Sequence, residues 1–189
     1  MSKRRSGLKN DQRAYYCCPH PRPQICNPIT ISLTDIATVR GGSYYLNGDT
    51  TIQSCEILEF EYGIELVISP YKLINRGTIN NIGVINNVSN FNGIINKGII
   101  NQNGFGSITN YNGGIIDNTG GTIDNTSCFI NNINGGIIDN TGGTIDNTSG
   151  FINNTNGTIY LGDGSCGTIG TIITNGGSIS GNPPSNTCP

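Results

Sequence analysis

Isoleucine recurs at short, regular intervals between about Leu73 and Ser180, flanked by Thr, Asn or Asp and separated by Gly-Gly or Asn-Gly. The sequence GIIDNTGGTIDNTS occurs twice, at Gly114–Ser127 and Gly136–Ser149, with its two copies 22 residues apart. A fixed period of this length indicates stacked supersecondary units, in which each unit buries its apolar side against the next.

Each period divides into three short units, whose isoleucines form three columns when successive periods are aligned. The first column contains Ile74, Ile95, Ile116, Ile138, Ile159 and Ile179. The second contains Ile79, Ile100, Ile123, Ile145 and Ile169. The third contains Ile85, Ile108, Ile130, Ile152 and Ile173. Units of this length, rich in β-branched residues, are typical of strands, and glycine at this frequency would destabilise a helix by about 1 kcal/mol per residue.

The pattern therefore predicts an all-β protein, a single-stranded parallel β-helix (solenoid) with ~22 residues and three short strands per coil. We expect a right-handed coil, because connections between parallel strands are overwhelmingly right-handed. Alternation along a strand points Ile inward, the next residue outward and a following Asn inward. The expected inward residues are Asn81, Asn125 and Asn147, with Gln102 as an interruption, and Asn87, Asn110, Asn132, Asn154 and Asn175. Such asparagines either form hydrogen-bonded ladders or tolerate left-handed turns.

A hydrophobic content of 34% without Trp excludes a thick globular core but suits a thin rod. We expect residues 1–28 to form a basic, Cys/Pro-rich flexible tail and residues 29–72 to form N-terminal capping coils. The β-helix repeats would span 73–180, and 181–189 would form a C-terminal tail. The capping region contains four strand-like runs: Ile29–Ile36, Ser43–Leu46, Glu56–Phe60 and Ile64–Ser69.

The segment from Gly41 to Ile52, followed by Leu73–Asn81, resembles the entry to the Asn/Gly/Ile-repeat β-helix proteins of giant, mimivirus-like DNA viruses. Similar repeats occur in bacterial surface proteins. The resemblance covers about residues 41–180. It implies a non-enzymatic structural protein on a virion surface, such as a fibre or coat component acting as a rigid spacer, with other virion or surface proteins as partners. An extracellular or cell-surface location is the alternative.

Seven cysteines leave at least one unpaired within a monomer, so in an oxidising setting self-association by disulfide cross-linking is possible. The cysteines in the tails are the candidates: Cys17, Cys18, Cys26 and Cys188. In a reducing compartment all seven would stay thiols. A zinc site at Cys17, Cys18, His20 and Cys26 is disfavoured because it lacks the usual knuckle spacing.

Two pairs of aspartates lie one period apart, Asp117 with Asp139 and Asp124 with Asp146. Stacked coils would bring each pair to about 5 Å, a separation that also suits a retaining glycosidase. We favour solvated polar positions over catalysis, because other copies have Asn75, Asn80, Asn96 and Asn101 in these outward positions and because no Lys, Arg or His is placed to tune the carboxylates. We predict no catalytic or cofactor-binding residues. The four aspartates are weak Ca²⁺ candidates, because like charges in register repel unless bridged.

The basic tail is interpreted as solvated rather than as a nucleic-acid-binding segment, because it has few aromatic residues. No apolar stretch suits a cleavable signal peptide, and none approaches the ~20 residues of a membrane span. Glycan binding by the flat Asn/Thr faces, as in an adhesin, is the alternative function, and a polysaccharide-cleaving enzyme ranks third. Sequons lie at Asn87, Asn125, Asn147, Asn153 and Asn156 and matter only if the protein meets a glycosylation system.

Overall fold

The structure is a computed structural model that describes residues 27–88, 92–162 and 171–181, which form short strands and one turn of helix. The strands belong to three sheets, in the hydrogen-bonding orders given below. Sheet A consists of β1 (Ile29–Ile31), β5 (Glu56–Phe60), β8 (Thr78–Asn81), β11 (Ile99–Gln102), β14 (Thr122–Asp124) and β17 (Thr144–Asp146). Sheet B consists of β2 (Ala37–Arg40), β3 (Ser43–Leu46), β6 (Glu65–Val67), β9 (Val84–Asn87), β12 (Ser107–Tyr111), β15 (Phe129–Ile133), β18 (Phe151–Asn153) and β20 (Thr171–Ile173). Sheet C consists of β4 (Thr50–Ile52), β7 (Leu73–Asn75), β10 (Asn92–Asn96), β13 (Ile115–Asp117), β16 (Ile137–Asp139), β19 (Thr158–Leu161) and β21 (Ser178–Gly181).

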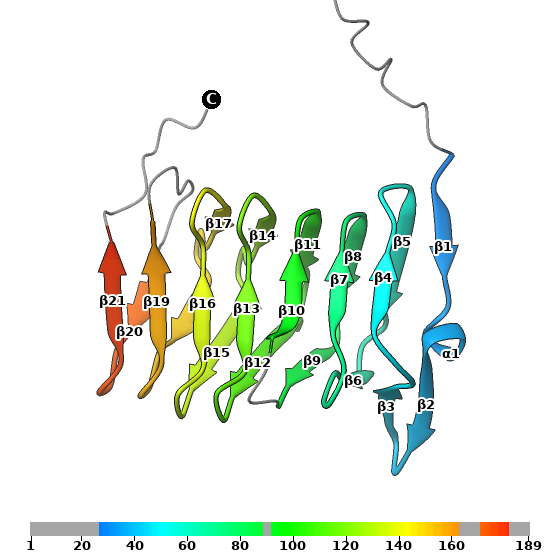
Figure 1. Ribbon diagram of the computed structural model, residues 1–189, viewed down its shortest axis with the longest axis horizontal. Helices are drawn as coiled ribbons and strands as arrows, with labels where there is room; N and C mark the ends of the chain where they lie inside the picture. The colour runs from blue at the N-terminus through cyan, green and yellow to red at the C-terminus, as the bar shows by residue number, and fades with distance from the viewer. Residues whose placement is uncertain (1–26, 89–91, 163–170, 182–189) are drawn as a thin grey trace, which may run out of the picture.

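Successive coils lie side by side along one axis, as the strands of sheet C show from β4 to β21 in Figure 1. Each coil contributes one strand to each sheet, and paired strands run parallel except for β2 and β3. From β3 onward, facing residues in neighbouring coils are 19 to 23 positions apart in sequence. The predicted parallel β-helix with three strands per coil is confirmed. The right hand of the coil stays a prediction.

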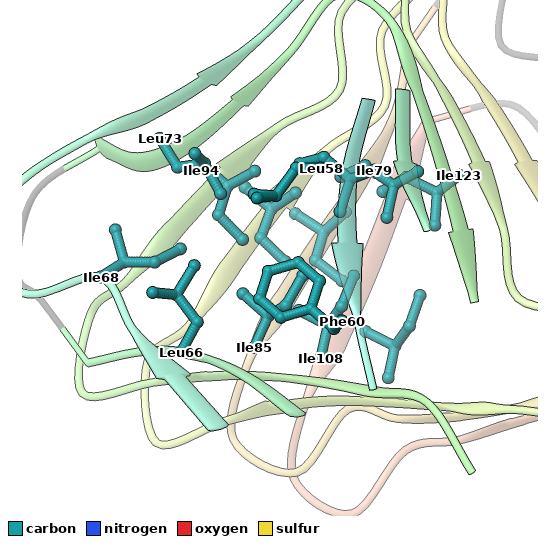
Figure 2. Close-up of a cluster of buried hydrophobic side chains, with 14 of the residues drawn as sticks. Leu58, Phe60, Leu66, Ile68, Leu73, Ile79, Ile85, Ile94, Ile108 and Ile123 are labelled. Atoms are coloured by element: carbon teal, nitrogen blue, oxygen red, sulfur yellow. The ribbon is translucent and has the colours of Figure 1, made fainter. Parts of the chain in front are cut away.

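The interior consists of three stacked apolar columns whose side chains point toward one another (Figure 2). The sheet A column contains Leu58, Ile79, Ile100, Ile123 and Ile145, and the sheet B column contains Leu66, Ile85, Ile108, Ile130 and Ile152. These two columns confirm the predictions for residues 79–145 and 85–152. The sheet C column contains Leu73, Ile94, Ile116, Ile138 and Ile159.

The first predicted column is wrong at two positions. Ile74 and Ile95 are only half-buried, whereas Leu73 and Ile94 are fully buried and align with Ile116. The reason is that side chains two positions apart on a strand point to the same side. Asn75 and Asn96 are buried amides, so Leu73 and Ile94, two positions earlier, face inward with them. Ile173 is also wrong as a member of the third column, since it is 53% exposed and Ile172 aligns with Ile152 instead. Ile179 aligns with Ile159, as predicted, but is 41% exposed in the last described strand of the stack. Ile169 lies outside the described residues.

Twelve amide side chains are buried in the interior and form three hydrogen-bonded ladders along the rod. The sheet C ladder contains Asn75, Asn96, Asn118 and Asn140. The sheet A ladder contains Asn81, Gln102, Asn125 and Asn147. The sheet B ladder contains Asn87, Asn110, Asn132 and Asn154. In each step Nδ2 or Nε2 of one coil donates to the amide oxygen of the next, at 2.5 to 3.4 Å.

The ladders correct three expectations. Gln102 does not interrupt its ladder, because its Oε1 accepts from Asn81 and its Nε2 donates to Asn125. The sheet C ladder was not expected at all, since Asn75 and Asn96 were assigned to the outside. Asn175 is exposed and belongs to no ladder. The alternative of left-handed turns applies to other asparagines: Asn112, Asn134 and Asn156 have φ between 51° and 53°.

Apolar residues close the N-terminal end of all three ladders. In the preceding coil, Ile52 is paired with Asn75 and Phe60 is paired with Asn81. Val67 of β6 is paired with the residue before Asn87, so Ile68 lies at the start of the sheet B ladder. Ile52, Phe60 and Ile68 are each at most 2% exposed. The ladders therefore begin beneath an apolar layer, which keeps water from competing for their amides.

The first coil also contains the one helix and the one antiparallel strand pair of the described chain. The expected strand Ile29–Ile36 is wrong in its second half, because Ser32 caps the helix α1 (Leu33–Ile36) and forms a capping box with Asp35. The antiparallel strand β2 then covers the edge of sheet B at this end (Figure 1). At the other end β21 extends through Gly181, one residue beyond the expected boundary.

Candidate functional site

The four predicted aspartates lie on the outer faces of two sheets, in register across neighbouring coils. Asp117 pairs with Asp139 in sheet C, and Asp124 pairs with Asp146 in sheet A. Asp124 occupies the same column as Asn80 and Asn101, as expected. Asp117, however, aligns with the isoleucines of positions 74 and 95 rather than with asparagines.

Each of these carboxylates closes a local turn. In all four cases Oδ1 accepts from the backbone N–H of the threonine two residues later, at 2.9 to 3.0 Å. Such turns end a strand at a coil corner. They give the aspartates a structural task that the sequence interpretation did not assign to them.

The expectation that no Lys, Arg or His lies near these carboxylates is wrong for Asp117, which alone among the four has a cation beside it within the described residues. Lys97 Nζ lies 3.5 Å from Asp117 Oδ1 and also donates to the Thr119 carbonyl at 2.6 Å. Partial burial raises the pKa of Asp117, but the hydrogen bonds from Thr119 and the charge of Lys97 outweigh it. The pKa of Asp117 therefore lies below its ordinary value.

The Ca²⁺ prediction for Asp117, Asp139, Asp124 and Asp146 stays a prediction. Each pair of stacked aspartates supplies two carboxylates, whereas Ca²⁺ takes six to eight oxygen ligands. Within the described ranges, no three side chains of His, Cys, Asp or Glu gather where they could hold a metal ion.

The cross-link candidates Cys17, Cys18, Cys26 and Cys188 lie outside the described residues, as do His20 and Cys166. Cys55 is disulfide-bonded. Cys128 is a free thiol, fully buried at a coil corner. Burial and the charge of Asp124 raise the pKa of Cys128, so this thiol is poorly suited to nucleophilic chemistry.

The sequons divide into two groups. Asn87, Asn125 and Asn147 are buried ladder residues, and a glycan at any of them is incompatible with the folded interior. Asn153 is half-buried and Asn156 is exposed. Only these last two are accessible to modification in the folded rod.

Two shallow hollows lie at the ends of the described rod. One of about 470 Å³ lies in the first coils, lined by Thr30, Ser32, Tyr44, Glu59 and Glu61 among others. The second, of about 280 Å³, lies on sheet C near the C-terminal end, where Asp139, Thr141, Tyr160 and Ser180 combine a carboxylate, an aromatic ring and hydroxyls.

One outer edge carries a row of exposed apolar side chains. It follows the corner between sheets A and B, where five successive coils present Tyr62, Ile82, Phe105, Phe129 and Phe151, which we call the apolar edge. Exposure ranges from 39% for Ile82 to 76% for Phe105. The rings of Tyr62 and Phe105 meet edge-on with centroids 5.4 Å apart, and those of Phe129 and Phe151 stack at 5.6 Å.

The sequence interpretation missed the apolar edge because it treated these aromatic residues as sparse and unrelated. One signal was present in the sequence: Phe129 and Phe151 each directly precede an inward isoleucine of the third column. Ser107 occupies the same position one coil earlier.

No family model, curated protein or solved structure matches this chain. No helix in the described part of the chain is long and apolar enough to cross a membrane.

Proposed function

We propose that this chain is a non-enzymatic structural protein, a rigid spacer displayed on a virion or another surface. The observation that carries the proposal is the set of three buried amide ladders, which link each coil to the next over four coils. Bending the rod would stretch hydrogen bonds that no solvent can replace, since the amides are 0 to 1% exposed. A stiff body is what a spacer requires.

The outer faces and the redox chemistry also support display. Polar but mostly uncharged residues fill the outward positions of the repeats, for example Thr109, Asn131 and Asn153 in sheet B. The disulfide at Cys55 is typical of proteins in oxidising surroundings. The aspartates support a structural rather than a catalytic task, because all four hold turns.

Quantitative mass spectrometry of purified particles or surface fractions from the source, compared with the remaining cell material, tests the proposal. We expect the chain to be enriched with the particle or surface fraction. Recovery only from the soluble cell fraction would refute the display role.

A glycan-binding module is the second candidate, favoured by the hollow around Tyr160. An exposed aromatic ring beside a carboxylate and hydroxyls provides both an apolar face and hydrogen-bond partners for a sugar. A glycan array with the intact chain and with Tyr160→Ser tests this candidate, because Ser180 occupies the same column in the next coil. Binding that Tyr160→Ser abolishes would favour the glycan-binding function over the spacer.

A further inference from the structure

The apolar edge draws its five residues from the same corner of five consecutive coils, which are about 4.8 Å apart. Tyr62, Ile82 and Phe105 lie in the turns at this corner, whereas Phe129 and Phe151 begin β15 and β18, in the column of Ser107. Ile82 lies next to the glycine before Phe105, since a Cβ on Gly104 would be 3.6 Å from Ile82 Cγ2. Two ring contacts join the members at either end.

The exposed apolar area is large for a protein of this size. Aromatic side chains present roughly 150–250 Å² each, so exposures of 39 to 76% leave on the order of 500 Å² uncovered on this edge. That value lies near the upper end for a soluble monomer, where the largest patches are often functional. Two such edges in contact would bury on the order of 1,000 Å², about the minimum for a specific interface.

The area and the length of the edge favour a second copy of this chain as the occupant. A partner that covers all five side chains at once must follow the corner over five coils. A second copy of this chain has an apolar edge of the same length, and self-complementary contacts of this kind generate closed dimers. Stacking of sugar rings is less suited to the edge, because Phe129 and Phe151 already direct ring faces at each other, with an interplanar angle of 12°.

Charge selects the orientation of the pair. Glu61 directly precedes Tyr62 at one end of the edge and is exposed, and no Lys or Arg lies among residues 59–64. Parallel rods would place this carboxylate beside the same carboxylate of the partner, which costs free energy. Antiparallel rods separate the two Glu61 carboxylates by the length of the edge.

We propose that two copies of this chain pair antiparallel along the apolar edge. Phe105 lies at the middle of the row and would meet its own copy, and Ile82 would face Phe129 of the second copy. Tyr62 would face Phe151. The pairing is a property of the rod itself and does not depend on where the protein is displayed.

Sedimentation equilibrium over a range of concentrations tests the proposal, with full-length material that runs as a monomer on a non-reducing denaturing gel. We expect a reversible monomer–dimer equilibrium. The double variant Phe129→Ser/Phe151→Ser should weaken the dimer roughly tenfold or more. Serine is suited to these positions because Ser107 occupies the same column.

The matched control is Ile99→Thr, which removes a 44% exposed isoleucine from sheet A, in a column where the neighbours are Thr78 and Thr122. It should leave the dimer unchanged, and circular dichroism should show that both variants keep the wild-type unfolding midpoint within a few degrees. A wild-type chain that stays monomeric, or a double variant that dimerises as the wild type does, would overturn the proposal.

A photoreactive phenylalanine analogue in place of Phe151 tests the orientation. After irradiation of the dimer, mass spectrometry should find it cross-linked to the partner peptide that contains Tyr62. Cross-linking to the partner peptide that contains position 151 would show parallel rods and overturn the antiparallel arrangement.

Discussion

Asn96 Nδ2 donates to Asn118 Oδ1 at 2.7 Å, and the same Nδ2 donates to the Thr122 carbonyl at 2.9 Å. One side chain thus satisfies another side chain and a backbone carbonyl of the next coil. Because both asparagines are fully buried, the contact joins two coils without help from water.

Replacement of a ladder asparagine should therefore be costly. Asn118→Ala leaves Asn96 Nδ2 with only the Thr122 carbonyl as acceptor and removes the Asn118 donor to Asn140 Oδ1. We expect a loss of about 2–4 kcal/mol in the free energy of unfolding, measured by urea denaturation. The control is Asn101→Ala on the outer face, where only a bond to Asn80 is lost and a change below about 1 kcal/mol is expected. Equal losses for the two variants would contradict the ladder's role.

Two adjacent isoleucines test which side chain faces the interior. Ile94 is fully buried and Ile95 half-buried, so Ile94→Ala should leave a cavity and cost about 2–5 kcal/mol. Ile95→Ala should cost about 1 kcal/mol or less. Thermal or urea unfolding of the pair measures the difference, and the reverse order would show that the register of sheet C is shifted by one residue.

Gly150 lies at a coil corner where the backbone of the preceding coil approaches closely, although Cys128 occupies the aligned position of that preceding coil. A Cβ on Gly150 would lie 2.1 Å from the Asn125 carbonyl oxygen, whereas one on Gly48 would meet nothing within 4 Å. Gly150→Ala should destabilise the protein by roughly 1–3 kcal/mol, and Gly48→Ala should change its stability by no more than about 0.5 kcal/mol. Similar unfolding midpoints in calorimetry would contradict the close approach of the coils.

The pKa of Asp117 predicts a pH dependence with a definite sign. Because the folded-state pKa lies below the ordinary value of 3.8, ionised Asp117 stabilises the fold above that pH. The contribution is lost as the pH falls through the lower folded-state value. It should stay below about 1 kcal/mol, since the pair is partly exposed to solvent.

Unfolding free energies of the wild type and Lys97→Gln between pH 2 and pH 6 measure this contribution. The two curves should differ at pH 6 and converge at the acidic end, where Asp117 is protonated in both. A constant difference across the whole range would show that Lys97 acts through packing or through its bond to the Thr119 carbonyl instead.

The sequence predicted the solenoid because isoleucine, asparagine and glycine recur at matching positions, and each has a distinct physical task. It failed where two apolar residues are adjacent: alternation alone does not decide between Leu73 and Ile74, or between Ile94 and Ile95. The amide two positions after the inward residue, as in Ile116 and Asn118, resolves the choice in the strands from β7 to β18, whereas Leu161 follows Ile159 in β19.

The candidate surfaces were less accessible from the sequence. Phe105 lies in a turn two residues before Ser107, whereas Phe129 and Phe151 begin β15 and β18 in the column of Ser107. That all three lie at one corner emerges only once the strand register is known. Likewise, the turn-closing task of Asp117 depends on the backbone N–H of Thr119, which composition does not reveal.

Deletion of one coil tests the stacked-coil architecture most directly. Removal of residues 114–135 joins Gly113 to Gly136 and deletes a whole period, so every remaining column and ladder keeps its register. The control deletion of residues 114–124 removes half a period and shifts all later strands onto the wrong sheet. Circular dichroism with urea unfolding should show a β-rich, cooperatively unfolding protein for the first deletion and lost cooperativity for the second. Equal folding of both chains, or unfolding of the whole-period deletion alone, would contradict the stacked-coil account.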